Sequence, residues 1–126
     1  QSPLLNTRVF WLDACPDAVL AELYAGCHLA LYPSFAEGWG LPVSEALAHG
    51  REVIASDAGA IPEAARGAAT LLDPRDDTSW IAALREAAAR PRRTIKPPVQ
   101  PEWDSAAALA IAGIQRLAAH AGTRPA

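Results

Sequence analysis

The chain lacks several features that would assign it to a familiar class. It has no apolar run of about 18 residues, the length that a membrane-spanning helix needs, and it does not begin with the pattern of a signal peptide. It has only two cysteines, Cys15 and Cys27, and their spacing to the histidines is not that of a zinc site. We therefore expect no membrane span, no bound metal, and reduced thiols of the kind found in cytoplasmic proteins.

Positive charge is also scarce. The formal net charge is -3, and the only dense basic cluster comprises Arg90, Arg92, Arg93 and Lys96. We interpret that cluster as a solvated loop, so nucleic-acid binding has little support.

With 126 residues the chain has the size of a single domain with a real core. Candidate strands and helices alternate through the first 90 residues, which favours an α/β fold with a parallel sheet and right-handed crossovers. The expected strands are 9–12, 28–32, 53–55 and 69–72. The expected helices are 17–25, a helix that begins near Pro42 and ends at Gly50, the short 61–65, and 78–90, capped by Asp76 or Asp77.

The most informative stretch is 33–50, PSFAEGWGLPVSEALAHG. It follows the apolar run 28–32, so its order is strand, glycine-rich loop, helix. Gly38 and Gly40 would let the backbone turn tightly and approach a ligand, and Pro42 suits the first turn of a helix. Since the free N–H groups at a helix start attract anions, the pattern predicts a phosphate site.

Two glutamates in this stretch call for a different ligand group. An ionised carboxylate only accepts hydrogen bonds, so Glu37 in the loop and Glu45 in the helix suit neighbouring sugar hydroxyls. Val43, Ala46 and Leu47 share one helix face and Glu45 points away from it. Either glutamate alone would fit an ordinary solvated surface, and the combination with Gly-Trp-Gly-Leu-Pro is what favours a ligand site.

The residues of this stretch resemble those of a known family. Glu37 and Glu45 match the E-x7-E motif of the retaining, nucleotide-sugar-dependent glycosyltransferases of group 1, which have the GT-B fold. The resemblance covers roughly residues 8–90, with matching segments in the family's order and spacing at 32–34, 37–42, 45–46, 50, 53–56, 59, 62–63 and 72–74. Trp39 stands where Phe is commoner in the family.

The resemblance implies roles for these residues. Glu45 would bind the ribose hydroxyls of the donor nucleotide, and Glu37, the candidate catalytic residue, would contact the donor sugar near the reacting carbon. The backbone around Gly38, Gly40, Leu41 and Pro42 would hold the distal phosphate. The family requires no metal or cofactor, and its acceptors are glycans or lipid-linked molecules. A glycosidase pair, the weaker alternative, does not suit glutamates beside a phosphate-type loop.

The resemblance also implies an organisation. Residues 1–90 would be the later half of the second, C-terminal Rossmann-like domain of a GT-B enzyme, 91–102 a proline-rich linker, and 103–122 a terminal helix that crosses to another domain. The Arg and Lys that the family uses against the diphosphate would precede Gln1. The chain alone is then expected to be inactive and to self-associate. A non-catalytic nucleotide-sugar-binding or assembly module of the same fold is the alternative.

Overall fold

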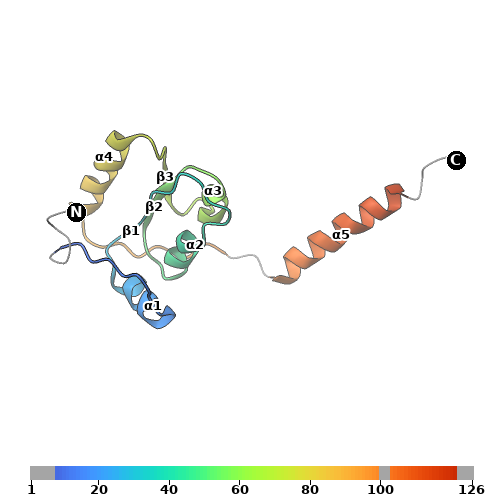
Figure 1. The fold of residues 1–126 in the computed structure, drawn as a ribbon, viewed down its shortest axis with the longest axis horizontal. Coiled ribbons are helices and arrows are strands. Elements are labelled where there is room, and N and C mark those ends of the chain that lie inside the picture. The colour runs from blue at the N-terminus through green and yellow to red at the C-terminus, as the bar shows by residue number, and fades with distance from the viewer. Residues whose placement is uncertain (1–7, 100–102, 122–126) are drawn as a thin grey trace.

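The computed structural model describes residues 8–99 and 103–121. The chain forms the helices α1 (Asp17–Gly26), α2 (Leu41–Ala48), α3 (Ile61–Ala65), α4 (Asp77–Ala88) and α5 (Trp103–Ala121), and the strands β1 (Ala30–Tyr32), β2 (Val53–Ser56) and β3 (Thr70–Leu72). The order of elements through α4 alternates helix and strand, as the sequence predicts (Figure 1).

The three strands form one parallel sheet in the order β1-β2-β3. Ala30 is in register with Val53, and Ile54 with Thr70. All four residues of β2 are buried, because the central strand is covered on both faces. The expected α/β fold with a Rossmann-like parallel sheet and flanking helices is therefore confirmed.

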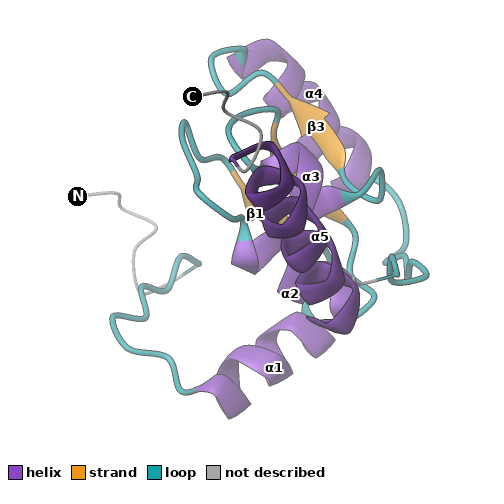
Figure 2. Ribbon diagram, turned by 90° about the vertical axis from the view of Figure 1, so that its right-hand side faces the viewer, coloured by secondary structure: helices purple, strands orange, loops and turns teal. Residues whose placement is uncertain are grey.

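Helices α2 and α3 cover the sheet and contact each other. Their apolar faces and β2 supply the core, which consists of Val43, Ala46, Leu47, Val53, Ala55, Ile61 and Ala65. Helix α1 lies beside α2 in both overall views (Figures 1 and 2). The side chain of Asp76 caps α4 by accepting from the N–H groups of Thr78 and Ser79, one of the two caps that the sequence allowed.

One expected element is wrong. Val9 forms a single β-bridge, but residues 10–12 are not in a strand, and the apolar side chains of the run are exposed: Phe10 to 70% and Trp11 to 79%. An apolar run predicts a strand only where a neighbouring strand can pair with it. The named strands of the sheet are β1, β2 and β3, and beyond the single bridge at Val9 the run does not continue as a further strand.

The proline-rich segment after α4 is held against the rest of the chain. The Ile95 N–H donates to the Gly50 carbonyl at 3.0 Å, and Arg51 and Thr94 form an isolated antiparallel bridge. Residues 91–99 thus lie along the end of α2, without regular structure but with defined contacts. Farther on, α5 exposes large apolar side chains at Leu109, Ile111 and Ile114.

Candidate functional site

The glycine-rich loop connects the carboxyl end of β1 to α2. Gly40 precedes α2 in the left-handed conformation, with φ at 78°, and a Cβ there would lie 3.0 Å from the Ala64 Cβ. The N–H groups of Val43 and Ser44 both donate to the Gly40 carbonyl, and Pro42 has no N–H. Since no side chain caps this helix, the Leu41 N–H is the first-turn donor left for an anion.

The loop after β2 packs directly on the first loop. The Ala60 N–H donates to the Glu37 carbonyl at 3.1 Å. Gly59 has φ at 55°, and a Cβ at this position would lie 2.5 Å from the same carbonyl oxygen. Only glycine allows this approach. Because β1 and β2 are parallel neighbours, the loops that follow them lie at the same edge of the sheet, and there they are in contact.

The Glu37 carboxylate is held from two sides. The Tyr32 hydroxyl donates to Oε2, and the Gly38 N–H donates to Oε1 at 2.9 Å. The tyrosine bond and, after it, the loop N–H groups of Gly38, Trp39 and Gly40 lower the pKa of Glu37 from its ordinary value. The loop amides that the sequence predicts as an anion site thus already face an anion of the chain itself.

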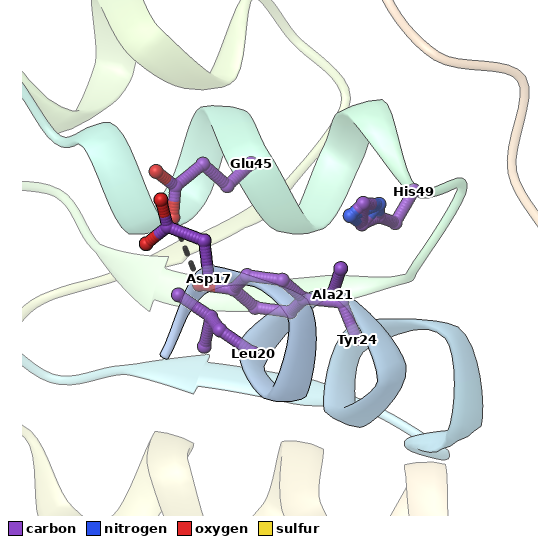
Figure 3. A pocket seen from close by; sticks show the side chains of 6 residues that line it. All are labelled: Asp17, Leu20, Ala21, Tyr24, Glu45 and His49. Carbon is purple, nitrogen blue, oxygen red and sulfur yellow. Dashed lines mark hydrogen bonds between the residues drawn. The ribbon is translucent and has the colours of Figure 1, made fainter. Parts of the chain in front are cut away.

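Glu45 is exposed on α2 and faces α1 (Figure 3). Tyr24 of α1 donates its hydroxyl toward Glu45 Oε2 and the Pro42 carbonyl, each at 3.4 Å. Burial and, after it, the charge of Glu45 raise the pKa of Tyr24 to about 12. The Tyr24 ring also lies 5.5 Å from the His49 ring, centre to centre.

These side chains line a shallow pocket of about 180 Å³ between α1 and α2, formed by Asp17, Leu20, Ala21, Tyr24, Glu45 and His49. The carboxylates of Asp17 and Glu45 lie at one end and His49 at the other (Figure 3). Hydroxyls of a ligand could donate to the carboxylates while its apolar part contacts Leu20 and Ala21.

The predicted site residues therefore fall into two groups. Glu37, Gly38 and Gly40 share the loop at the end of β1, with Leu41 and Pro42 at the start of α2. Glu45 lines the pocket against α1, and neither Gly40 nor Leu41 belongs to that pocket's lining. Phe35 and Trp39 in the loop and Leu41 at the start of α2 are 68%, 66% and 57% exposed.

Sequence reasoning missed Asp17, Tyr24 and Tyr32. Asp17, Leu20, Ala21 and Tyr24 recur at helical spacing, so the pattern could have predicted one face of α1, but not which element that face meets. Tyr32 is the last residue of β1, directly before the loop. A polar tip on an otherwise apolar strand end is a signal that the ring ends in a hydrogen bond.

The described residues contain no cluster of three or more His, Cys, Asp or Glu side chains placed to hold a metal ion. None of the helices in that part of the chain is long and apolar enough to cross a membrane.

Comparison with known proteins connects this geometry to a family. The family model described as "Glycosyl transferases group 1" matches residues 2–90, which is most of the chain. The chain belongs to the group 1 glycosyltransferases. The resemblance seen in the sequence is thereby confirmed at the level of the family.

Several individual glycosyltransferases are similar to parts of the chain. The "O-antigen chain mannosyltransferase B" of Escherichia coli is 41% identical over 74 residues, which are 56% of this chain and 19% of the relative. The "O-antigen chain mannosyltransferase RfbU" of Salmonella typhimurium is 33% identical over 81 residues, 64% of this chain and 23% of the relative.

The "D-inositol 3-phosphate glycosyltransferase" of Nocardia farcinica is 34% identical over 82 residues, 64% of this chain and 18% of the relative. The similarity thus spans about a fifth of the length of each of these relatives. No solved structure is significantly similar to the chain.

Proposed function

We propose that residues 1–90 are the donor-binding portion of a retaining glycosyltransferase, the later half of its C-terminal domain. The transferred sugar would be of the mannose, glucose or rhamnose type, carried by a nucleotide and passed to a glycan or lipid-linked acceptor. Two of the relatives are mannosyltransferases, which favours mannose. In this proposal the protein is cytoplasmic, and the reaction requires neither a metal nor a cofactor.

One observation carries this proposal: two ionisable carboxylates, eight positions apart, flank the uncapped start of α2 at the carboxyl end of a parallel sheet. Ligands of open α/β sheets bind at this edge. Carboxylates there suit sugar and ribose hydroxyls, and a free helix N–H suits a phosphate oxygen. A nucleotide-sugar contains all three kinds of group.

In this proposal Glu45 accepts hydrogen bonds from the ribose, and Glu37 accepts them from hydroxyls of the donor sugar. The N–H of Leu41, preceded by Gly40 and followed by Pro42, faces the distal phosphate. When the sugar leaves, negative charge builds up on the diphosphate, and a fixed dipole that is aimed at this charge lowers the barrier. We assign Glu37 no covalent role.

A non-catalytic nucleotide-sugar-binding or assembly module is the second candidate. One observation favours it, namely that Arg8 is the only Lys or Arg in the sequence before Arg51. Arg51 itself is buried and directs its guanidinium at the His49 carbonyl and the Thr94 hydroxyl. A diphosphate at the α2 start would therefore find no cation among these residues, and catalysis requires cations from other parts of the protein.

The test is donor binding and turnover in the full-length protein. Glu45→Ala should weaken nucleoside diphosphate binding by about 1 to 3 kcal/mol, the range for a hydrogen bond to a charged group. Glu37→Ala should lower kcat for sugar transfer more than it lowers nucleotide affinity. Isothermal titration calorimetry and a transfer assay with GDP- and UDP-sugars measure the two effects.

Glu22→Ala is the matched control, because Glu22 is an exposed glutamate of α1 outside the pocket lining. It should leave both affinity and kcat unchanged. Unchanged nucleotide affinity in Glu45→Ala would refute the ribose role. Nucleotide binding by the full-length protein without any sugar transfer or donor hydrolysis would decide for the non-catalytic module.

A further inference from the structure

The chain contains two tyrosines, and each directs its hydroxyl at one of the two site glutamates. Tyr24 reaches Glu45 from α1, and Tyr32 reaches Glu37 from the end of β1. The two pairs differ in geometry, and the difference indicates different tasks.

The Tyr24 hydroxyl is loosely bound. It is shared between Glu45 Oε2 and the Pro42 carbonyl at 3.4 Å each, near the limit for a hydrogen bond. Glu45 Oε1 receives no hydrogen bond from the described residues. The exposed side chain of Glu45 can therefore turn toward a ligand.

The Glu37 carboxylate, in contrast, has a donor on each oxygen. The half-buried Tyr32 side chain closes on Oε2, while the Gly38 N–H binds Oε1 at 2.9 Å. The backbone of Glu37 is also fixed, because the Ala60 N–H binds its carbonyl and Gly59 packs against it. Each of the two carboxylate oxygens keeps lone pairs for a further donor.

We propose that Tyr32 is a positioning residue that, together with the Gly38 N–H, fixes the Glu37 carboxylate as an immobile hydrogen-bond acceptor for a donor-sugar hydroxyl. This inference rests on the proposed function for the identity of the ligand, and on the hydrogen bonds of the chain for the fixed carboxylate. A preoriented acceptor pays no reorganisation when the sugar becomes positively charged in the transition state.

The same contacts speak against proton transfer by Glu37. Donors on both oxygens stabilise the ionised form and lower the pKa of Glu37, and the hydrogen bond to Glu37 raises the pKa of Tyr32. The other titratable side chain in the loops around Glu37 is Asp57, an exposed carboxylate of the loop after β2. Glu37 therefore serves as a constant negative charge near neutral pH.

Tyr32→Phe in the full-length protein is the test, because it removes the hydroxyl and keeps the ring. We expect kcat for sugar transfer to fall about 10- to 100-fold, the effect of misplacing a group at a reacting centre. The dissociation constant for the nucleoside diphosphate should change by less than about twofold. In ¹³C NMR titration of the Glu37 carboxyl, the pKa should rise toward the ordinary value.

Tyr24→Phe is the matched control, and it should leave the Glu37 titration where it is in the wild type. An unchanged Glu37 titration in Tyr32→Phe, or an unchanged kcat, would overturn the positioning role. If the wild type transfers no sugar, the proposed function fails, but the NMR titration still decides whether Tyr32 holds Glu37.

If Tyr32→Phe does not fold, 3-fluorotyrosine is incorporated at position 32 of the full-length protein. Its more acidic hydroxyl is the stronger hydrogen-bond donor, so the Glu37 pKa should fall further. A Glu37 pKa that does not respond would then overturn the proposal.

Discussion

The two ends of the sheet carry opposite kinds of polar groups. At the carboxyl end lie Glu37, in the loop after β1, and Glu45, on the helix that follows it. Their partners are tyrosine hydroxyls and a backbone N–H. Large apolar side chains of the same loop are exposed there. This end offers acceptors and apolar surface to a ligand.

At the amino end of the sheet, three arginines contact other elements of the chain. Arg90 forms a two-pronged ion pair with Glu52, directly before β2, with one N–O distance of 2.6 Å. Arg92 donates to the carbonyls of Ala25 and Gly26 at the end of α1. Arg51, also just before β2, donates to the His49 carbonyl and to the Thr94 hydroxyl. These cations tie the segment after α4 to the ends of other elements, so the basic cluster that the sequence suggested to be a solvated loop contains structural contacts.

The comparison teaches that Arg51, Arg90 and Arg92 make their contacts away from the candidate site. An ion pair or a carbonyl contact occupies each of these three guanidinium groups. The carboxyl end keeps its carboxylates without a cation partner among the described residues. Binding of a diphosphate at this end therefore requires cations other than these three arginines.

The largest expected effect comes from separating these residues from any other part of the protein. A polypeptide of residues 1–126 should transfer no sugar, and it should bind nucleoside diphosphates with a Kd in the millimolar range or weaker, about 4 kcal/mol of binding free energy. The helix dipole contributes only about 0.3 to 2 kcal/mol and does not replace the missing cations. Calorimetry and a donor hydrolysis assay measure both quantities.

The same polypeptide should self-associate in sedimentation velocity. β1 and β3 are edge strands within residues 8–99, and α5 exposes Leu109, Ile111 and Ile114. A strict monomer with measurable transferase activity would show that the carboxyl end of the sheet needs no further cation, and the comparison of the two ends would be wrong.

The second effect concerns the contact between the two loops at the carboxyl end. Gly59→Ala should lower the free energy of unfolding by about 2 to 4 kcal/mol, because it adds a left-handed alanine and a Cβ too close to the Glu37 backbone. Urea denaturation of the variant and the wild type measures the loss.

Two glycines separate the causes of that loss. Gly67 is left-handed with φ at 73°, but a Cβ there meets nothing within 4 Å, so Gly67→Ala reports the backbone strain alone. For Gly38, which also has open space, the Gly38→Ala change should stay within about 1 kcal/mol. If Gly59→Ala costs no more than Gly67→Ala, the loops do not depend on their close approach.

Most of the architecture could be predicted from local patterns. Apolar runs bounded by Gly and Pro predicted β1, β2 and β3 to within two residues at each end, and Pro42 and Gly50 marked the two ends of α2. The failure at 9–12 has a physical reason, since hydrophobicity alone does not say whether a pairing partner exists. That information is non-local.

The candidate site shows the same division. Glu37, Gly38 and Gly40 were found because they lie together in the sequence. Tyr24 and Asp17 lie more than 20 positions before Glu45, and only the packing of α1 on α2 brings them to it. Likewise, the contact of Gly59 with Glu37 depends on how the two loops meet in space. Spacing finds neighbours within one element, and packing decides the rest.

The third effect tests the amino end through pH. The hydrogen bond from Arg90 lowers the pKa of Glu52, and burial raises it by less. The net result is a pKa below the ordinary value of 4.5. Stability from this pair is therefore present above pH 4.5 and is lost as the pH falls through the folded-state pKa. Glu52→Gln should be less stable than the wild type at pH 7, by less than Gly59→Ala, and the gap should close in acid.

Guanidinium-free urea titrations at a series of pH values measure this gap, since guanidinium salts would screen the pair. Glu22→Gln is the control for loss of one exposed carboxylate. A gap that stays constant below pH 4.5 would show that the Arg90 contact does not stabilise the amino end.

The smallest expected effect lies in the Tyr24 hydroxyl at the pocket between α1 and α2. Tyr24→Phe should change the free energy of unfolding at pH 7 by less than about 1 kcal/mol, because both hydrogen bonds of the Tyr24 hydroxyl are long and shared.

At alkaline pH the direction of the stability change follows from the pKa of Tyr24, which is about 12 in the folded chain against 10.0 in the unfolded chain. The wild type loses stability as the pH rises from about 10 toward 12, because the unfolded chain releases the proton first. In Tyr24→Phe this loss disappears, so the variant should gain on the wild type across that interval. Urea denaturation at pH 8, 10 and 11, with Tyr32→Phe in parallel to separate the contribution of the second tyrosine, measures this change. If the stabilities of the wild type and the variant run parallel over this interval, the Tyr24 hydroxyl is as free in the folded chain as in the unfolded one, and the pocket between α1 and α2 is open to water.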